Sequence, residues 1–274
     1  FRSNTTYTAI LPSPAPTADV GDTHRFRLAM SQTLSRPEYR ELSPILSQDV
    51  LDGDNIQGNP ELRRTLIQNF DARWEWYPSS GEIISLGGFA KRFQDPIERV
   101  YLPTSGSRVL SFANPEGAYN YGVEVEARKE LGSFAPVLEP FSVSANFTAM
   151  RSRIEVGSDS IQINSDRALV GQAPYVLNTG LTWAPGEGRT SATLLYNVVG
   201  ERIYAAGARG LPDLIERPRS VLDFSLRLGV TANVAAKLDA RNLLDSPFEV
   251  KQGGVTREYY RSGRVVSLGM TWQP

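Results

Sequence analysis

Carboxylates are the residues of this chain that come nearest to forming a chemical site. Glu124 and Glu126 are separated by one residue, and glycoside hydrolysis needs a pair of acids, so the sequence alone does not exclude that reaction. The stretch Asp49–Asn55 gathers side-chain oxygens that could hold calcium. No glutamate follows it at the distance that an EF-hand requires, so a solvated loop is the favoured interpretation.

Other reactive residues are scarce. The chain has no cysteine, which excludes thiolate metal sites and cysteine nucleophiles. His24 is the only histidine, so a catalytic triad or a paired-histidine zinc site would lack its usual parts, and we interpret His24 as a strand residue near a turn. The sequence contains no GxSxG, phosphate-binding or dinucleotide-binding motif. We therefore predict that the protein is not an enzyme and that it uses no cofactor and no resident metal ion.

Composition narrows the class of protein further. The 274 residues carry a formal net charge of -1, and this near-neutral balance argues against a nucleic-acid partner. No stretch approaches the roughly 18 consecutive apolar residues of a membrane-spanning helix. The mean hydropathy of -0.29 is nevertheless compatible with a membrane β-barrel, because only every second residue of its strands meets lipid.

The elements that would position the charges have a period of two residues. Leu222, Phe224 and Leu226 alternate with polar residues, and the same alternation recurs in 121–128 and 141–149. Such a pattern is typical of strands whose two faces meet different solvents, as in a transmembrane barrel with lipid outside and water inside. We predict that these charged residues face the lumen, chiefly as a hydrated wall: Arg25, Arg27, Glu124, Glu126, Arg128, Asp223 and Arg227.

About 11 strands are expected, with ends uncertain by a few residues. They are 11–18, 23–35, 63–77, 82–96, 117–131, 138–155, 174–184, 189–204, 218–229, 232–243 and 262–273, and residues 1–8 are a further candidate. Short turns alternate with long connections near 36–61, 97–116, 156–173, 205–217 and 244–261. Bacterial barrels pair short periplasmic turns with long outer loops in this way.

One segment fits two templates. Asn59-Pro60-Glu61 followed by Leu62, Leu66 and Phe70 has the form of a capped amphipathic helix. From Leu66 onward the alternation of a strand fits as well. We predict a strand, for consistency with the neighbouring segments.

The positions of the tryptophans agree with this assignment of strands and turns. Trp74 and Trp76 precede one short turn, Trp183 precedes another, and Trp272 lies near the C-terminus. Strand parity places all four at one rim, while several tyrosines gather at the long-loop ends. Two aromatic belts are expected where a barrel meets the two membrane interfaces. Ordinary enrichment of aromatic residues in strands is the alternative explanation.

Six short motifs in a fixed order point to a family. They are Ile10-Leu11-Pro12-Ser13, the strand from Arg27 to Arg36-Pro37, Gly58-Asn59-Pro60-Glu61-Leu62, Asn120-Tyr121-Gly122-Val123-Glu124, Gly171-Gln172-Ala173-Pro174-Tyr175 and Arg241-Asn242-Leu243-Leu244-Asp245. Together they resemble the β-barrel of TonB-dependent outer-membrane receptors over nearly the whole chain. The motif residues that we single out are Arg36, Pro37, Gly58, Asn59, Pro60, Asn242 and Asp245.

This resemblance implies a bacterial outer-membrane barrel of roughly 22 strands that holds an N-terminal plug. It also implies import of a siderophore, vitamin or similar scarce nutrient, such as a metal chelate, with energy from the TonB complex. We expect residues 1–274 to be a single incomplete domain, the C-terminal part of such a receptor, built of about 11 or 12 meandering antiparallel strands. It would supply barrel wall and outer loops, contact outer-membrane lipid and leave the plug and the TonB-binding region to the rest of the protein. Segments 36–61 and 202–219 are the candidate ligand-contacting loops.

Two other functions remain open at this stage. The first is a passive outer-membrane pore, or a complete barrel of about 12 strands. The second is a soluble, secreted β-sandwich that binds carbohydrate, whose apolar side chains would fill a dry interior between two stacked sheets.

Overall fold

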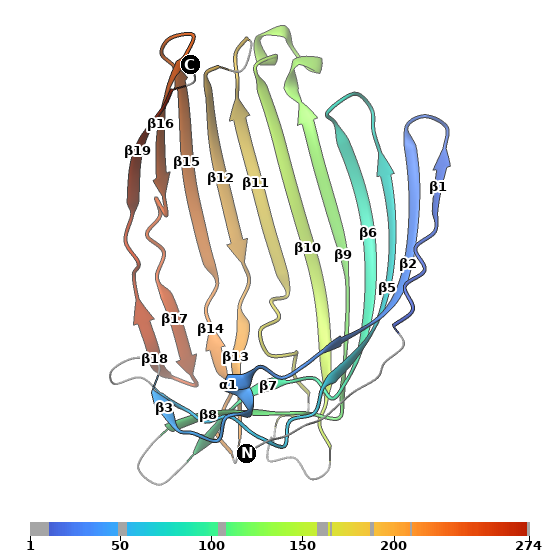
Figure 1. Ribbon diagram of the computed structural model, residues 1–274, viewed down its shortest axis with the longest axis vertical. Helices are drawn as coiled ribbons and strands as arrows, with labels where there is room; N and C mark the ends of the chain where they lie inside the picture. Colours follow the sequence, from blue (N-terminus) through green and yellow to red (C-terminus); the bar gives the residue numbers. More distant parts are fainter. Residues whose placement is uncertain are drawn as a thin grey trace.

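The computed structural model describes residues 11–48, 54–103, 108–157, 164, 166–186, 189–208 and 210–272. The candidate strand at 1–8 and most of the acidic stretch from Asp49 lie outside these residues. The described chain is nearly all β and forms two sheets (Figure 1). Among the described residues no helix is both long and apolar enough to cross a membrane.

The larger sheet, which we call the wall, has 11 strands. In spatial and chain order they are β1 (Thr17–Val20), β2 (His24–Ser35), β5 (Thr65–Trp76), β6 (Ile83–Gln94), β9 (Gly117–Glu130), β10 (Phe141–Glu155), β11 (Tyr175–Trp183), β12 (Ser191–Val199), β15 (Arg219–Gly229), β16 (Val234–Arg241) and β19 (Val265–Trp272). Each pairs antiparallel with the next, without a register shift. The all-β antiparallel meander predicted from the alternation is confirmed.

The first strand begins later than predicted, at Thr17. The carbonyls of Pro12, Pro14 and Pro16 accept hydrogen bonds of 3.0–3.1 Å from amides of β2. Proline has no N–H to return a bond, so this stretch forms only half of a ladder. The prediction recognised the extended chain but not the effect of the prolines.

Other boundaries also differ. The segment predicted as one strand over 189–204 is divided at Gly200: β12 ends at Val199, and a new strand begins at Arg202 in the second sheet. Ahead of β10, Leu138, which was predicted to begin that strand, is the last residue of a short 3₁₀ helix, η2 (Pro136–Leu138), which follows η1 (Leu131–Ser133). In 59–76 the strand prediction is confirmed from Thr65 onward, and the helix-like signal ahead of it corresponds to a single turn closed by a bond from the Leu62 amide to the Asn59 carbonyl.

The long connections contain regular strands, and no pattern in the sequence indicated these strands. In the described part of the chain, all of these connections except the one at 156–173 contribute to a second sheet of 8 strands, which we call the loop sheet, at one end of the wall (Figure 1). Its strands in spatial order are β18 (Val255–Tyr260), β17 (Phe248–Gln252), β14 (Leu214–Glu216), β13 (Arg202–Gly207), β7 (Glu98–Pro103), β8 (Arg108–Ala113), β4 (Asn55–Ile56) and β3 (Ser47–Gln48). The one described α-helix, α1 (Tyr39–Leu42), lies beside it.

The larger of two hydrophobic clusters among the described residues belongs to the loop sheet, and a smaller one joins Ala118 of β9 and Ile154 of β10 to Leu169. Tyr101, Leu110, Ala205, Leu214 and Val250 are buried together in one cluster. These residues come from five strands in three different connections: β7, β8, β13, β14 and β17. Two of these strands, β7 and β13, pair in parallel. The loop sheet therefore has the packed interior of a water-soluble protein.

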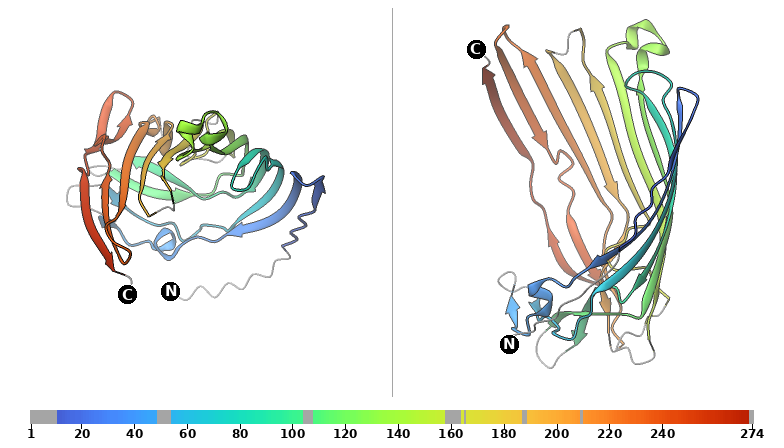
Figure 2. Two further views of the ribbon diagram at one scale, coloured as in Figure 1. Left: turned by 90° about the horizontal axis from the view of Figure 1, so that it is seen from above. Right: turned by 45° about the vertical axis from the view of Figure 1, so that its right-hand side comes forward.

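The wall is curved, and its two faces differ. Seen from above, the wall forms an arc, and β7 and β8 cross its concave side (Figure 2). The concave face carries polar side chains. One of them is Ser152, whose hydroxyl accepts a hydrogen bond from the Leu169 amide in the connection between β10 and β11. Arg167 of the same connection forms an ion pair with Glu98 of β7. The convex face is apolar and open, with Leu268 83% exposed and Met270 78% exposed. Within the described part of the chain no second sheet covers these residues, so the stacked-sandwich alternative is wrong.

Candidate functional site

The concave face of the wall carries the charged residues predicted for the lumen. The strand register places all of them on one face: Arg25, Arg27, Glu124, Glu126, Arg128, Asp223 and Arg227. The alternation was therefore sufficient to group them, because no bulge interrupts the pairing from β2 to β15.

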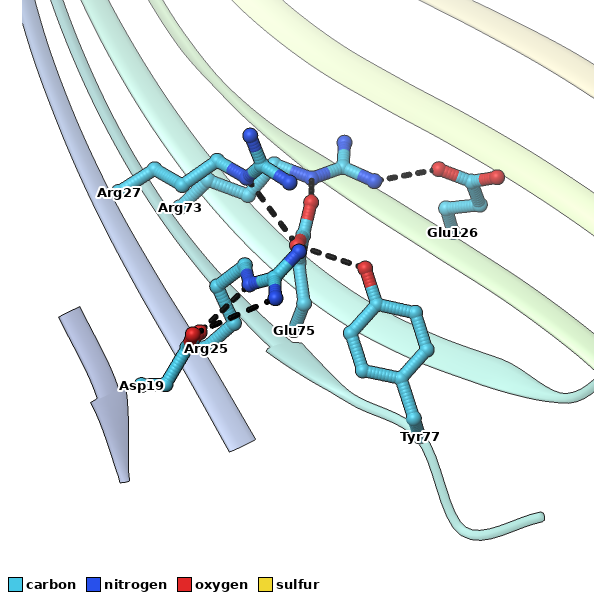
Figure 3. Close-up of polar contacts among 7 residues, drawn as sticks. All are labelled: Asp19, Arg25, Arg27, Arg73, Glu75, Tyr77 and Glu126. Carbon is cyan, nitrogen blue, oxygen red and sulfur yellow. Dashed lines mark hydrogen bonds and ion pairs between the residues drawn. The ribbon is translucent and has the colours of Figure 1, made fainter. Parts of the chain in front are cut away.

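A network centred on Glu75 lies near the short-turn end of this face (Figure 3). The Glu75 carboxylate is 6% exposed and accepts bonds from Arg27 at 3.2 Å, from Arg73 at 2.9 Å and from the Tyr77 hydroxyl at 2.8 Å. Arg73 also donates to Glu126 at 2.6 Å, which extends the network across β6 to β9. The bonds join residues of β2, β5 and β9 and the turn after β5, so the network forms a rigid, hydrophilic surface.

The sequence analysis missed the centre of this network. Arg73 and Glu75 alternate with Trp74 and Trp76 inside the predicted strand 63–77, so the same parity that selected Arg27 could have found them. Figure 3 shows the predicted Arg25 at the edge of the network, where it pairs with Asp19 of β1 at 2.6 Å.

A polar groove continues along the same face. Its volume is about 380 Å³, and its lining includes Glu126, Arg128, Asn146, Asn178 and Asp223. Carboxylate, guanidinium and amide groups in this arrangement can exchange hydrogen bonds with water or with a polar protein surface. No cluster of three or more metal-ligating side chains occurs among the described residues, which include the Glu124 and Glu126 pair.

The motif at 241–245 makes the junction between wall and loop sheet. Asn242 and Asp245 have positive φ values of 55° and 46°, a backbone region that asparagine and aspartate tolerate better than most residues. The Asn242 amide N–H donates to the Asp223 carboxylate at 2.8 Å, and its side chain donates to the Gly263 carbonyl at 2.7 Å. Asp245 accepts the Gly263 amide at 3.1 Å. The predicted lumen residue Asp223 thus stabilises this junction.

The motif at 58–60 also has a structural role. A Cβ atom on Gly58 would lie 2.6 Å from the Arg40 and Glu41 carbonyl oxygens, so only glycine fits against α1. The Asn59 side chain donates to the Phe112 carbonyl at 3.0 Å and accepts the Glu61 amide at 2.9 Å. Of the remaining motif residues, Pro60 and Arg36 are exposed, and Pro37, which follows β2 by two residues, is half-buried.

A buried ion pair joins the connection between β10 and β11 to the loop sheet. Glu98 of β7 and Arg167 are each 2% exposed, with Arg167 Nη2 2.7 Å from Glu98 Oε2. Glu98 also accepts the Val170 amide at 2.8 Å. The two residues are 69 positions apart, and no local pattern marks either of them, so the sequence analysis did not select them.

The four predicted interface tryptophans lie at the short-turn ends of their strands, on the apolar face. The Trp74 indole N–H donates to His24 Nδ1 at 3.2 Å, and the His24 ring stacks against both Trp74 and Trp76. Trp183 and Trp272 are the last residues of β11 and β19. Their contact with a membrane interface stays a prediction.

The turn between β5 and β6 holds a further carboxylate that the sequence did not indicate. Glu82 accepts the Lys129 ammonium at 2.8 Å and the Glu130 amide at 3.1 Å, and its side chain is buried. The bond from Lys129 lowers the pKa of the Glu82 carboxyl below its ordinary value, against the opposing effect of burial.

Comparison with known protein families identifies the family of this chain. The profile of the family described as TonB dependent receptor-like, beta-barrel matches residues 3–243. The chain belongs to this family. It is accordingly a segment of an outer-membrane β-barrel of a bacterium, as the motifs predicted.

Relatives and solved structures are consistent with this membership. The chain is 25% identical over 241 residues to the iron-regulated outer membrane virulence protein of Vibrio cholerae serotype O1, covering 85% of this chain and 35% of the relative. The fold resembles the ferric enterobactin receptor of Pseudomonas aeruginosa, with a TM-score of 0.63 and 16% identity, over 96% of this chain and 40% of that one. It also resembles the ferric yersiniabactin uptake receptor of Yersinia pestis, with a TM-score of 0.64 and 18% identity, over 96% and 37%. The chain therefore spans little more than a third of the length of these proteins.

Proposed function

We propose that this chain is the C-terminal barrel portion of an outer-membrane receptor that imports a scarce nutrient, and that the nutrient is a metal-chelating siderophore. The observation that carries the proposal is the wall itself, with an apolar convex face and a charged concave face in a chain of this family. The similar solved structures named above are receptors for ferric chelates. Residues 1–274 would act as a single, incomplete domain of the receptor and would catalyse no reaction.

Each face then has its own partner. The convex face contacts lipid, and the loop sheet contributes to the ligand-binding side together with segments 36–61 and 202–219. The Glu75 network offers a fixed surface of alternating charge at the short-turn end, which suits a plug domain from the rest of the protein. The TonB complex would act through that plug.

The open sheet favours this proposal over a complete small barrel. In the described part of the chain, β1 pairs only with β2 and β19 only with β16, so the two edges do not close on each other. A wall with free edges needs further strands to span a membrane, because unpaired backbone groups in lipid are costly.

The test is uptake of ⁵⁵Fe-loaded siderophores by cells that lack all other such receptors and produce the full-length protein. We expect saturable uptake of at least one siderophore that stops when TonB is deleted. Uptake that is independent of TonB and varies only with solute size would instead indicate a passive pore. As a control, liposomes that contain only residues 1–274 should show no energy-dependent uptake.

A further inference from the structure

Three prolines ahead of β1 lie opposite three residues in the middle of β2, at one edge of the wall (Figure 1). The bonded pairs are Pro16 with Leu28, Pro14 with Met30 and Pro12 with Gln32, at 3.0–3.1 Å from amide nitrogen to carbonyl oxygen. In each pair the β2 amide donates to the proline carbonyl, but proline has no N–H with which to return a bond. Such pairs in an antiparallel ladder normally exchange two bonds. This join between residues 11–16 and β2, which we call the proline seam, therefore keeps half of its ladder.

The other joins of the wall are complete by the same criterion. Within the described wall, the 11 strands themselves contain no proline, and each pairs with the next without a register shift. Pro140, Pro174 and Pro218 each stand singly just before a wall strand, where a ladder ends. The missing bonds of the wall thus gather in the proline seam.

The proline seam is fixed at its short-turn end and loosely held along the middle of the wall. At the short-turn end, β1 pairs with β2 from Thr17 to Val20, and Arg25 donates to Asp19 at 2.6 Å. Every residue in 11–16, by contrast, is exposed. Within the described part of the chain, burial of side chains therefore does not replace the bonds that the prolines cannot make.

We propose that the wall opens along the proline seam: residues 11–16 separate from β2 and rejoin it, with the β1 ladder as the pivot, while the neighbouring joins stay paired. Opening the seam breaks three hydrogen bonds, whereas opening the join of β2 with β5 over the same length breaks roughly six. Ser31 and Asn69 line the concave side beside it, so water in the lumen can reach the freed amides. An opening here widens the lumen on one side and leaves the other ladders intact. The proposal rests on the chain being barrel wall, but not on which nutrient is imported.

The experiment is hydrogen–deuterium exchange of the full-length receptor in lipid nanodiscs, read at single amides of β2 by mass spectrometry with fragmentation. The amides of Leu28 and Met30 point to the seam, and we call them the seam amides. Those of Ala29 and Ser31 point the other way, to β5, and serve as an internal control. The seam amides should exchange at least about tenfold faster than this pair, a difference that corresponds to about 1.4 kcal/mol in the free energy of local opening. Equal exchange of the two sets would overturn the proposal.

Returning the missing donors should close the seam. Pro14→Val/Pro16→Val restores two N–H groups with a residue that suits a lipid-facing strand, and it should slow the seam amides at least about tenfold. The matched control is Ala15→Val/Ala18→Val, which places two valines in the same stretch at positions where no donor is missing. It should leave the seam amides unchanged. Slowing in both double variants, or in neither, would contradict the proposal.

A disulfide provides a second measurement that keeps the prolines. The three bonds set a register in which Ala15 faces Ala29 across the seam, at a type of position where opposite Cα atoms lie about 4.5 Å apart. Ala15→Cys/Ala29→Cys should therefore form a disulfide, and the oxidised form should exchange its seam amides at least about tenfold more slowly than the reduced form. Equal exchange in the two forms, or thiols that stay free under an oxidant, would each overturn the proposal. Thermal unfolding confirms that each variant is folded, and nutrient uptake is not part of the readout, so failure of the proposed transport leaves this test intact.

Discussion

The wall and the loop sheet of this chain are stabilised in opposite ways. In the loop sheet, Tyr101, Leu214 and Val250 are at most 2% exposed, and they pack against one another. In the wall, Leu268 and Met270 are more than three-quarters exposed. The loop sheet removes its apolar surface from water by internal packing, whereas the wall relies on hydrocarbon as its second layer.

This difference means that the two regions should respond to different perturbations. A lost internal partner should destabilise the loop sheet and leave the wall almost unchanged. A charge placed on the convex face should affect the wall, while the same charge on the concave face should be tolerated.

The largest effect is expected from breaking the buried pair. Glu98→Ala leaves the Arg167 guanidinium, 2% exposed, without its carboxylate, which should cost about 3–5 kcal/mol. The measurement is hydrogen exchange in the full-length receptor, where amides of β7 and β13 should lose protection while those of β5 and β9 keep theirs. Arg217→Ala is the control, because it removes one partner of the exposed pair with Glu201 and should cost at most about 1 kcal/mol. Equal losses in both variants would contradict the contrast drawn between the regions.

A smaller effect is expected from lysine substitutions in the middle of β15. Phe224→Lys places a charge on the convex face and should cost about 2–4 kcal/mol near the bilayer centre. Ser225→Lys places the same charge on the concave face beside Asp239, which already accepts a bond from Ser225 at 2.8 Å, and should cost far less. Unfolding in lipid vesicles by denaturant measures both. If the two variants were equally destabilised, the assignment of the convex face to lipid would be wrong.

Substitutions of Asn242, at the junction between the wall and the loop sheet, should lower stability by an intermediate amount. Two variants separate the effect of its side-chain hydrogen bond from the effect of its backbone conformation. Asn242→Gly keeps the backbone at φ 55° without strain but loses the side-chain bond to the Gly263 carbonyl. Asn242→Ala loses that bond and adds strain of about 1–2 kcal/mol for a left-handed residue. Alanine should therefore be the more destabilising of the two in thermal unfolding, and the reverse order would show that backbone conformation is not what selects asparagine here.

The sequence was informative for the wall because each of its faces meets one solvent. Alternation in segments such as 121–128 survives in the structure residue by residue, and it placed Glu124, Glu126 and Arg128 on one face. The first strand was the exception, since the prolines from Pro12 to Pro16 look extended in sequence but cannot complete a ladder.

The loop sheet could not be predicted in the same way. Its strands are short, and two of its pairings are parallel and join distant connections, such as Val100 with Ala206. The partners Glu98 and Arg167 lie 69 positions apart, so nothing local indicates that either will be buried. The charged face of the wall was therefore predicted, although Arg73 and Glu75 at the centre of its network were not selected. The contacts between connections were not predicted at all.

The smallest effect is expected at the short-turn end of the wall, where Glu82 should make the free energy of unfolding depend on pH. The pKa of the Glu82 carboxyl is lowered from its ordinary value of 4.5, first of all by the bond from Lys129. Between the lowered value and 4.5 the unfolded chain binds more protons than the folded one, so the free energy of unfolding rises with pH across that window. The stabilisation is complete above 4.5 and is lost as the pH falls through the folded pKa. Glu82→Gln cannot titrate, so its unfolding free energy should depend less on pH than that of the parent in this acid range, while the hydrogen exchange of β7 and β13 should match the parent at every pH. An acid dependence equal to the parent's would show that Glu82 does not anchor the turn between β5 and β6.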